Sequence, residues 1–159
     1  MSDKKQEHDT SASVIGLAPS FEAFGMVMDF LSESDVFANF ELSALARVVR
    51  RQLTDGHNLA GIRGAEIIGY AGWLHTDKTT GEAWMEDRAI LKPLYGETAD
   101  AAALTIFAAS DKAITQRLIR GARELNTGKR VFFKRGYDGV VRPGRKNTVL
   151  NMTGSEPTS

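Results

Sequence analysis

Apolar residues recur along the first third of the chain at spacings that predict two helices. Residues 21–31 carry Phe21, Phe24, Met28 and Leu31 three or four positions apart, after a start at Pro19-Ser20 in which Ser20 can act as N-cap. A longer stripe predicts a second helix from about 36 to 53, with arginines on or near its other face. The stripe consists of Phe37, Phe40, Leu42, Leu45, Val48, Val49 and Leu53, and the arginines are Arg47, Arg50 and Arg51.

A strand pair follows these helices. Residues 58–63 and 66–75 flank Gly64-Ala65, a two-residue connection typical of a tight hairpin. Apolar side chains alternate on both faces of 66–75, which predicts a central strand covered on both sides. Gly69 and Gly72 within it indicate a bulge or the close approach of another group.

The second half predicts a strand, a helix and a hairpin after a polar excursion at 76–100 that has room for one short helix. Residues 101–109 (AAALTIFAA) form a short apolar run typical of a buried strand, and Ser110-Asp111 can cap a helix over 112–125 that ends near Gly128. Residues 130–135 and 139–142 then predict a hairpin around Tyr137-Asp138-Gly139.

These elements predict one domain of the α+β class, a sandwich of a mostly antiparallel sheet with two N-terminal helices and one crossover helix. We expect a disordered arm at 1–18, the domain at 19–146 and a disordered tail at 147–159. The chain has no cysteine, which excludes disulfides and thiol chemistry. Its polar start lacks the apolar core of a secretion signal, and no apolar run approaches the roughly 18 residues of a membrane span, so we expect a cytoplasmic protein.

Charge is unevenly distributed although the chain is neutral overall. Residues 1–111 carry 9 Lys/Arg and 17 Asp/Glu, whereas residues 112–146 carry 11 Lys/Arg and 2 Asp/Glu. Such polarity concerns partners and encounter rates rather than the fold. The basic region is either a solvated face or a docking surface for an acidic partner, such as an acyl carrier protein or a nucleic acid.

The stretch 25–73 carries a family resemblance. Gly25 opens an apolar run, Phe30 and Ser34 follow, an Arg-rich helix comes next, and a strand ends in Gly72-Trp73. In that order the pieces resemble the N-terminal half of the RTX toxin-activating lysine acyltransferases, whose fold is a variant of the GNAT acyltransferase layout. The resemblance covers roughly residues 25–142 through loose motifs.

The resemblance implies transfer of a fatty acyl group from acyl carrier protein to a lysine of a partner protein, with no bound cofactor. Members of that family use a histidine just after the first helix and an aspartate on a central strand. Here the histidine position falls on Phe37, and the aspartate position falls on Ile106, or on Thr105 if the register shifts by one. This chain is thus expected to be a divergent member without the usual catalytic pair.

Other residues are candidates for the missing chemistry. His75, at the end of the strand that contains Trp73, is the first candidate base because histidine titrates near neutral pH. Asp111 is a second candidate, although a helix cap is its simpler role. His57 is expected in an exposed turn and His8 in the arm. The resemblance places substrate or carrier binding at Trp73 and on the arginine face of the crossover helix, which consists of Arg117, Arg120 and Arg123.

Two further functions remain open from the sequence. One is a catalytically inactive acyltransferase-like domain that binds or regulates a partner, which Phe37 favours. The other is nucleic-acid binding through a basic hairpin that carries aromatic residues. Its residues are Lys129, Arg130, Lys134, Arg135, Arg142, Arg145 and Lys146 with Phe132, Phe133 and Tyr137. A homodimer is also possible. Residues 116–122 are only faintly similar to an acetyl-CoA pyrophosphate loop, because Gly121 falls within a helical pattern.

Overall fold

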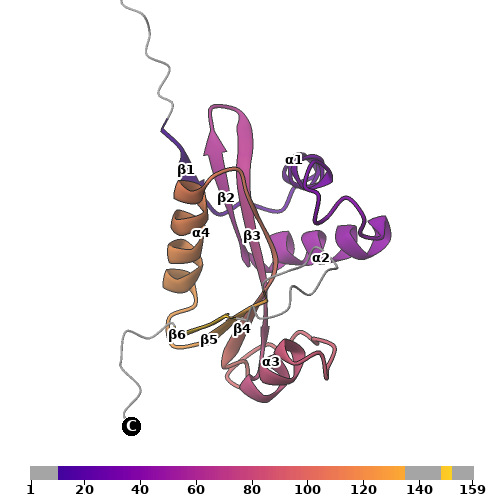
Figure 1. Cartoon of the computed structure of the whole chain (residues 1–159), viewed down its shortest axis with the longest axis vertical. Coiled ribbons are helices and arrows are strands. Elements are labelled where there is room, and N and C mark those ends of the chain that lie inside the picture. Colours follow the sequence, from indigo (N-terminus) through magenta and orange to yellow (C-terminus); the bar gives the residue numbers. More distant parts are fainter. Residues whose placement is uncertain (1–10, 135–147, 152–159) are drawn as a thin grey trace, which may run out of the picture.

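The computed structural model describes residues 11–134 and 148–151, and their side chains as far as Lys134. Four helices and six strands make up this part of the chain (Figure 1). The helices are α1 (Phe21–Ser32), α2 (Leu42–Asp55), α3 (Lys78–Met85) and α4 (Lys112–Leu125). The strands are β1 (Ser13–Ile15), β2 (Asn58–Arg63), β3 (Glu66–Thr76), β4 (Ala101–Ala109), β5 (Arg130–Phe133) and β6 (Thr148–Asn151).

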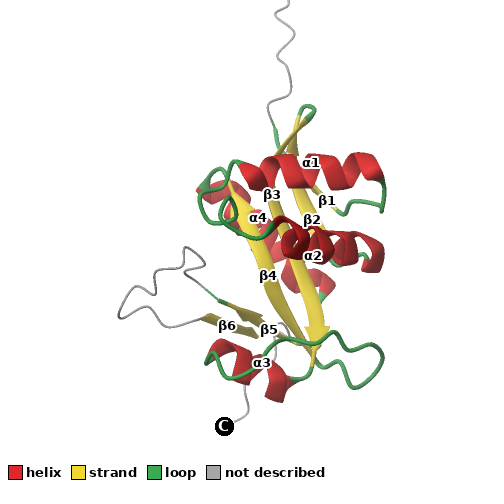
Figure 2. Cartoon of the chain, turned by 90° about the vertical axis from the view of Figure 1, so that its right-hand side faces the viewer, coloured by secondary structure: helices red, strands yellow, loops and turns green. Residues whose placement is uncertain are grey.

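The strands form a single sheet in the order β1-β2-β3-β4-β5-β6. Every neighbouring pair is antiparallel except β4 and β5, which are parallel and joined through α4. Helix α4 covers one face of the sheet and helices α1 and α2 cover the other, as Figures 1 and 2 show from two directions. The α+β sandwich, its mostly antiparallel sheet and its crossover helix are therefore confirmed.

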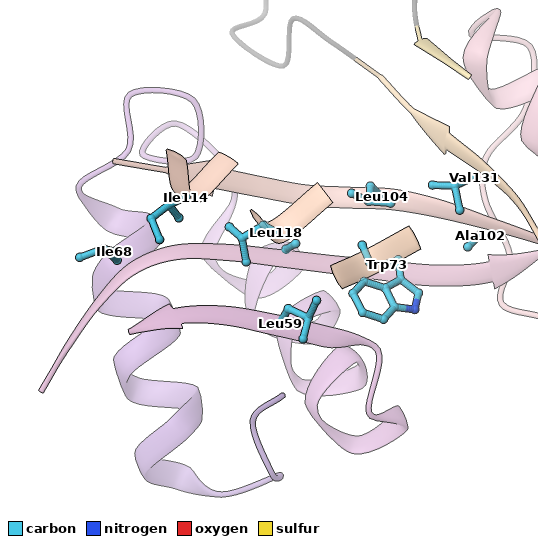
Figure 3. Packing of buried hydrophobic residues seen from close by; sticks show 10 residues of the cluster. Leu59, Ile68, Trp73, Ala102, Leu104, Ile114, Leu118 and Val131 are labelled. Carbon is cyan, nitrogen blue, oxygen red and sulfur yellow. The ribbon is translucent and has the colours of Figure 1, made fainter. Parts of the chain in front are cut away.

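Each face of the sheet has its own apolar cluster. The cluster under α4 packs Ile114, Leu118 and Ala122 against Trp73 and Leu104, and Figure 3 shows this layer. Because both faces are covered, β3 is buried along most of its length, as its two apolar faces predicted. The second cluster, which we call the helix-side cluster, lies between the sheet and α1 and α2. Its buried members are Ala23, Val27, Leu31, Phe37, Leu45, Val49, Leu53, Ala60, Tyr70 and Ile106.

Most predicted elements are confirmed within a few residues, but α2 begins later than expected. The sequence predicted a helix from about 36, whereas residues 34–40 form turns in which Phe37 N–H donates to the Ser34 carbonyl at 3.1 Å. These turns direct the Phe37 ring into the helix-side cluster, while Phe40 and Leu42 are exposed. The apolar residues between 37 and 53 thus do not all lie on one face of one helix. The prediction from their spacing assumed that they do, and it therefore placed the start of the helix too early.

The expected ends of the domain also need correction. Residues 13–15 form β1, paired with β2, although they fall in the segment expected to be a disordered arm. The partner of β5 is β6 at Thr148–Asn151, in the segment expected to be a disordered tail. The predicted strand at 139–142 and the turn at 137–139 lie outside the described residues. Among the helices that are described, none is long and apolar enough to cross a membrane.

Candidate functional site

A β-bulge at Thr105 shapes the centre of the sheet. Gly72 pairs with Ile106 and Trp73 pairs with Leu104, so Thr105 is an additional residue on β4. The bulge turns both Thr105 and Ile106 toward α1 and α2, since Thr105 contacts Gln52 and Ile106 belongs to the helix-side cluster. Thr105 and Ile106, the two alternative positions for the family's catalytic aspartate, therefore face the same side of the sheet.

Pairing between the two parallel strands ends at the same place. Strand β5 ends at Phe133, opposite Leu104, whereas β4 continues to Ala109. The edge of β4 that faces β5 thus has no β5 partner beyond Leu104 within the described residues. On the α4 side of this stretch, the rings of Phe107 and Phe133 meet edge to face with centroids 5.4 Å apart. We call this stretch of the β4 edge the β4–β5 gap.

A buried amide spans the bulge. Gln52 of α2 is 2% exposed, its Nε2 donates to Thr105 Oγ1 at 2.9 Å, and its Oε1 accepts from the Tyr70 hydroxyl at 2.9 Å. Burial raises the pKa of Tyr70, so its hydroxyl keeps the proton that it donates. The amide occupies the space beside Gly72, where a Cβ atom would lie 1.9 Å from Gln52 Oε1. This contact accounts for the glycine in the middle of a strand.

The positions aligned with the family's catalytic pair lie together in an apolar environment. Phe37 and Ile106 are each 2% exposed and both belong to the helix-side cluster. Their surroundings are aliphatic and aromatic side chains, which would strongly disfavour a charged acid or base there. The structure therefore brings the two positions to one cluster but gives them a packing role.

His75 lies on the opposite face of the sheet. It shares its face of β3 with Ala71 and Trp73, which pack under α4, and its Nε2 is 2.9 Å from Oδ1 of Asn126 at the end of α4. Asn126 Nδ2 donates to the Ala122 carbonyl at 2.8 Å, so its Oδ1 is the acceptor and His75 Nε2 carries the hydrogen. His75 thus does not reach the cluster that contains Phe37.

His57 is half-buried beside His75 rather than exposed in its turn. The two ring centroids are 4.0 Å apart, and the His57 ring also stacks on Trp73 at 6.2 Å. Burial, and then the neighbouring His75, lower the pKa of His57. Burial also lowers the pKa of His75, although its hydrogen bond to Asn126 acts in the opposite direction. Both shifts favour the neutral imidazole over the charged one. The sequence missed this pair because nothing in the spacing brings 57 and 75 together.

Asp111 is the N-cap of α4. Its Oδ1 accepts from Ile114 N–H at 2.9 Å, and its Oδ2 lies 3.7 Å from Nη2 of Arg63. A carboxylate therefore already occupies the helix N-terminus, which would otherwise favour a phosphate. Gly121, the glycine of the segment that is faintly similar to a pyrophosphate loop, lies inside α4 and not at its N-terminus. The residues at this helix end therefore do not fit a coenzyme A pyrophosphate. The capping role expected of Asp111 is confirmed.

The remaining candidates lie apart from one another. Trp73 is 2% exposed and forms part of the core, while Arg117, Arg120 and Arg123 are exposed along α4. In the described part of the basic hairpin, Arg130 pairs with Glu82, and Lys134 contacts Asp87. Phe132 is fully buried. Arg130 and Lys134 thus have partners within the chain, and the predicted basic residues of the hairpin from Arg135 on lie outside the described residues.

An unpredicted pocket lies against α2, and we call it the α2 pocket. Its cavity is about 190 Å³ and its surface is mostly apolar. It is lined by Arg47, Val48, Arg51, Gln52, Trp73, Leu74, Leu91, Pro93 and Thr105. Arg47 and Arg51 also line a shallower hollow of about 490 Å³ beside it, together with Arg50, Thr54, Asp55 and Tyr95. The sequence predicted these arginines only on or near the helix face opposite the apolar stripe.

A second hollow, of about 280 Å³, is acidic. It lies between α1 and the β2–β3 turn and is lined by Asp29 of α1, by Glu33 at the C-cap of that helix, and by Glu66 of β3. The pairing of Asp29 with Glu33 on one helix face follows from their spacing of four residues. Within residues 11–134 and 148–151, no cluster of three His, Cys, Asp or Glu side chains is arranged to hold a metal ion.

The mixed sheet with one parallel strand pair, joined by a crossover helix and covered by helices on both faces, is a GNAT-like fold. The chain is similar to the crystal structure of a GNAT-family acetyltransferase from Streptococcus agalactiae, with a TM-score of 0.53 and 12% sequence identity. The similarity covers 77% of this chain and 74% of that chain. Models of known protein families give no match, and no curated protein matches the sequence. At this identity the comparison shows the fold.

Proposed function

We propose that this protein is an acyltransferase of the toxin-activating type, which moves a fatty acyl group from an acyl carrier protein to a lysine of a partner protein. The observation that carries the proposal is the β4–β5 gap. Beyond Leu104 and Phe133, β4 presents an edge that no described residue of β5 pairs with. Such an edge offers backbone N–H groups to a thioester carbonyl, next to the rings of Phe107 and Phe133.

The transfer itself is a nucleophilic acyl substitution that passes through a tetrahedral intermediate. The lysine amine attacks the thioester carbonyl carbon, a C–N bond forms, the C–S bond breaks, and the thiol leaves. A backbone N–H on the β4 edge would stabilise the oxyanion of the tetrahedral intermediate. The amine must reach the carbonyl without its proton. Among the described residues, the buried polar side chains include no His, Asp or Glu that could replace the pair at Phe37 and Ile106. Acid–base catalysis typically contributes about 10²–10⁴-fold, so we expect a slow enzyme that depends on positioning.

Two features favour a carrier protein over coenzyme A as the donor. The N-terminus of α4 is capped by Asp111, whose charge opposes a pyrophosphate there. The exposed side of α4 presents Arg117 and Arg120, which suits an acidic carrier. The donor would thus be recognised mainly through the acidic surface of the carrier protein, and not through a pyrophosphate at the N-terminus of α4.

Intact-protein mass spectrometry with acylated carrier protein and a lysine-containing acceptor tests this function. We expect a complex with the carrier and a gain of one acyl mass on the acceptor, with acyl-coenzyme A a poorer donor. The Arg117→Gln/Arg120→Gln variant should weaken the carrier complex. Absence of any carrier complex with the folded protein would refute the proposal.

A second function, a binding or regulatory domain without catalysis, is favoured by the burial of Phe37 and Ile106 in one apolar cluster. His75 cannot replace the base there, because it faces α4 on the other side of the sheet. This function predicts a stable complex with acylated carrier and no transfer, even at pH 9, where more of the lysine is neutral. Transfer at pH 9 would exclude it.

A further inference from the structure

We propose that the α2 pocket binds a small carboxylate that has a short aliphatic tail. This site lies on the α2 side of the sheet, beside a wall formed by Leu91 and Pro93, and meets the β4–β5 gap only at Thr105. Binding there does not require that the protein transfers acyl groups. The argument rests on the charge at the mouth of the pocket and on the apolar wall within it.

The mouth of the pocket carries an excess of positive charge. Arg47 and Arg51 line both the pocket and the adjoining hollow, and Arg50 lies one turn from Arg47 with its guanidinium 5.3 Å from the Phe24 ring. Within the described part of the chain, none of the three forms an ion pair. Unpaired guanidinium groups one helical turn apart are suited to hold a carboxylate.

One acidic group shares this hollow. Asp55 lines it, but its Oδ2 already accepts from the Tyr95 hydroxyl at 3.0 Å. Three arginines against one aspartate leave the region positive. Tyr95 belongs to the segment that follows α3, and Leu94 N–H fixes that segment to the His75 carbonyl at 2.9 Å. The wall of the pocket is thus anchored to β3.

The interior of the pocket selects for an apolar tail. Val48, Leu74, Leu91 and Pro93 form its wall, and the cavity of about 190 Å³ is below the roughly 300–1,000 Å³ of sites for drug-sized ligands. At its floor, the amide of Gln52 is fixed by Tyr70 and Thr105 and does not turn into the cavity. A charged group fits at the rim, and a short alkyl chain fits inside.

Calorimetric titration of the full chain with butanoate, hexanoate, 1-hexanol and inorganic phosphate tests the site. We expect hexanoate to bind more tightly than butanoate by about fourfold per buried methylene. Hexanol, which lacks the charge, and phosphate, which lacks the tail, should each bind at least about tenfold more weakly than hexanoate. The backbone amide signal of Leu74, which lines the pocket, should shift with hexanoate, while that of Ala122 under α4 stays unchanged.

Matched variants locate the binding. Arg47→Gln/Arg51→Gln should weaken hexanoate binding by about tenfold or more, and Leu91→Ala should reduce the gain per methylene. Lys78→Gln/Lys112→Gln, at exposed positions on α3 and α4, removes the same charge and should leave binding unchanged. A thermal melt shows that each variant is folded. Equal binding of hexanoate and phosphate, no saturable binding of hexanoate, or no effect of Arg47→Gln/Arg51→Gln would overturn the proposal. None of these results depends on carrier binding at α4.

Discussion

At the scale of single residues, the lack of a side chain at Gly72 leaves room for a buried polar network. Its hydrogen faces the Gln52 amide, which links α2 to β3 through Tyr70 and to β4 through Thr105. A larger residue would remove the room for that amide. Because the amide is 2% exposed, displacing it would leave buried polar groups without partners.

The variant Gly72→Ala should therefore destabilise the protein. Its Cβ would lie 1.9 Å from Gln52 Oε1, so Gln52 must move and lose both hydrogen bonds. We expect the free energy of unfolding to fall by about 2–4 kcal/mol, measured by urea denaturation.

Gly25→Ala is the matched control. Gly25 is an exposed position within α1, and no atom lies within 4 Å of the site of a Cβ there. Alanine should stabilise the helix by about 0.5–1 kcal/mol. An equal effect of the two substitutions would contradict the role assigned to Gly72.

The His57–His75 pair should make stability depend on pH. The pKa of each ring is lowered in the folded protein, so between the folded pKa and 6.5 the unfolded chain binds more protons. The contribution of the pair is thus fully present above about pH 6.5 and is lost as the pH falls through the folded pKa values. Asp55, which raises both pKa values, and Lys129, which lowers both, are the nearby charges.

Urea midpoints measured between pH 5 and 7.5 check this dependence. We expect the midpoint of the native protein to decrease below pH 6.5, and His57→Asn to flatten the decrease. A midpoint that does not change across this range would show that the rings are not held neutral.

At the scale of elements, α4 depends on its cap. Asp111→Ala removes the acceptor for Ile114 N–H and should cost about 1 kcal/mol of stability in thermal or urea unfolding. Asp111→Asn keeps an acceptor and loses mainly the exposed contact to Arg63, which is worth little. A cost for asparagine as large as that for alanine would show that charge, rather than capping, is the contribution of Asp111.

The sequence predicted elements well where local patterns decide them. The Gly64-Ala65 hairpin, the strand at 101–109 and the cap at Asp111 follow from short-range rules. The prediction failed where contacts between residues far apart in the sequence determine the structure. Strand β1 is three residues long and has no periodicity to detect, and β6 is defined by its pairing with β5. The His57–His75 pair and the α2 pocket arise only when the turn after α2, β3 and the 91–95 segment meet.

At the scale of the whole molecule, the absence of a base among the described residues around Phe37 and Ile106 predicts the pH profile of any acyl transfer. The rate should rise about tenfold per pH unit from 7 to 9, because the neutral fraction of a lysine with a pKa near 10.4 rises in that way. Initial rates at fixed ionic strength measure it. A plateau near pH 7 would reveal a base elsewhere in the chain and contradict the slow, position-dependent transfer proposed above.

The pairing of β5 with β6 has a consequence for shortened forms of the chain. Strand β5 is complete at Phe133, but its outer edge pairs with Thr148–Asn151, which lie later in the sequence. A chain that stops between residues 134 and 147 lacks β6 and would expose the outer edge of β5 to other chains. Proteolysis or premature termination in that interval should therefore yield a more aggregation-prone form of the protein.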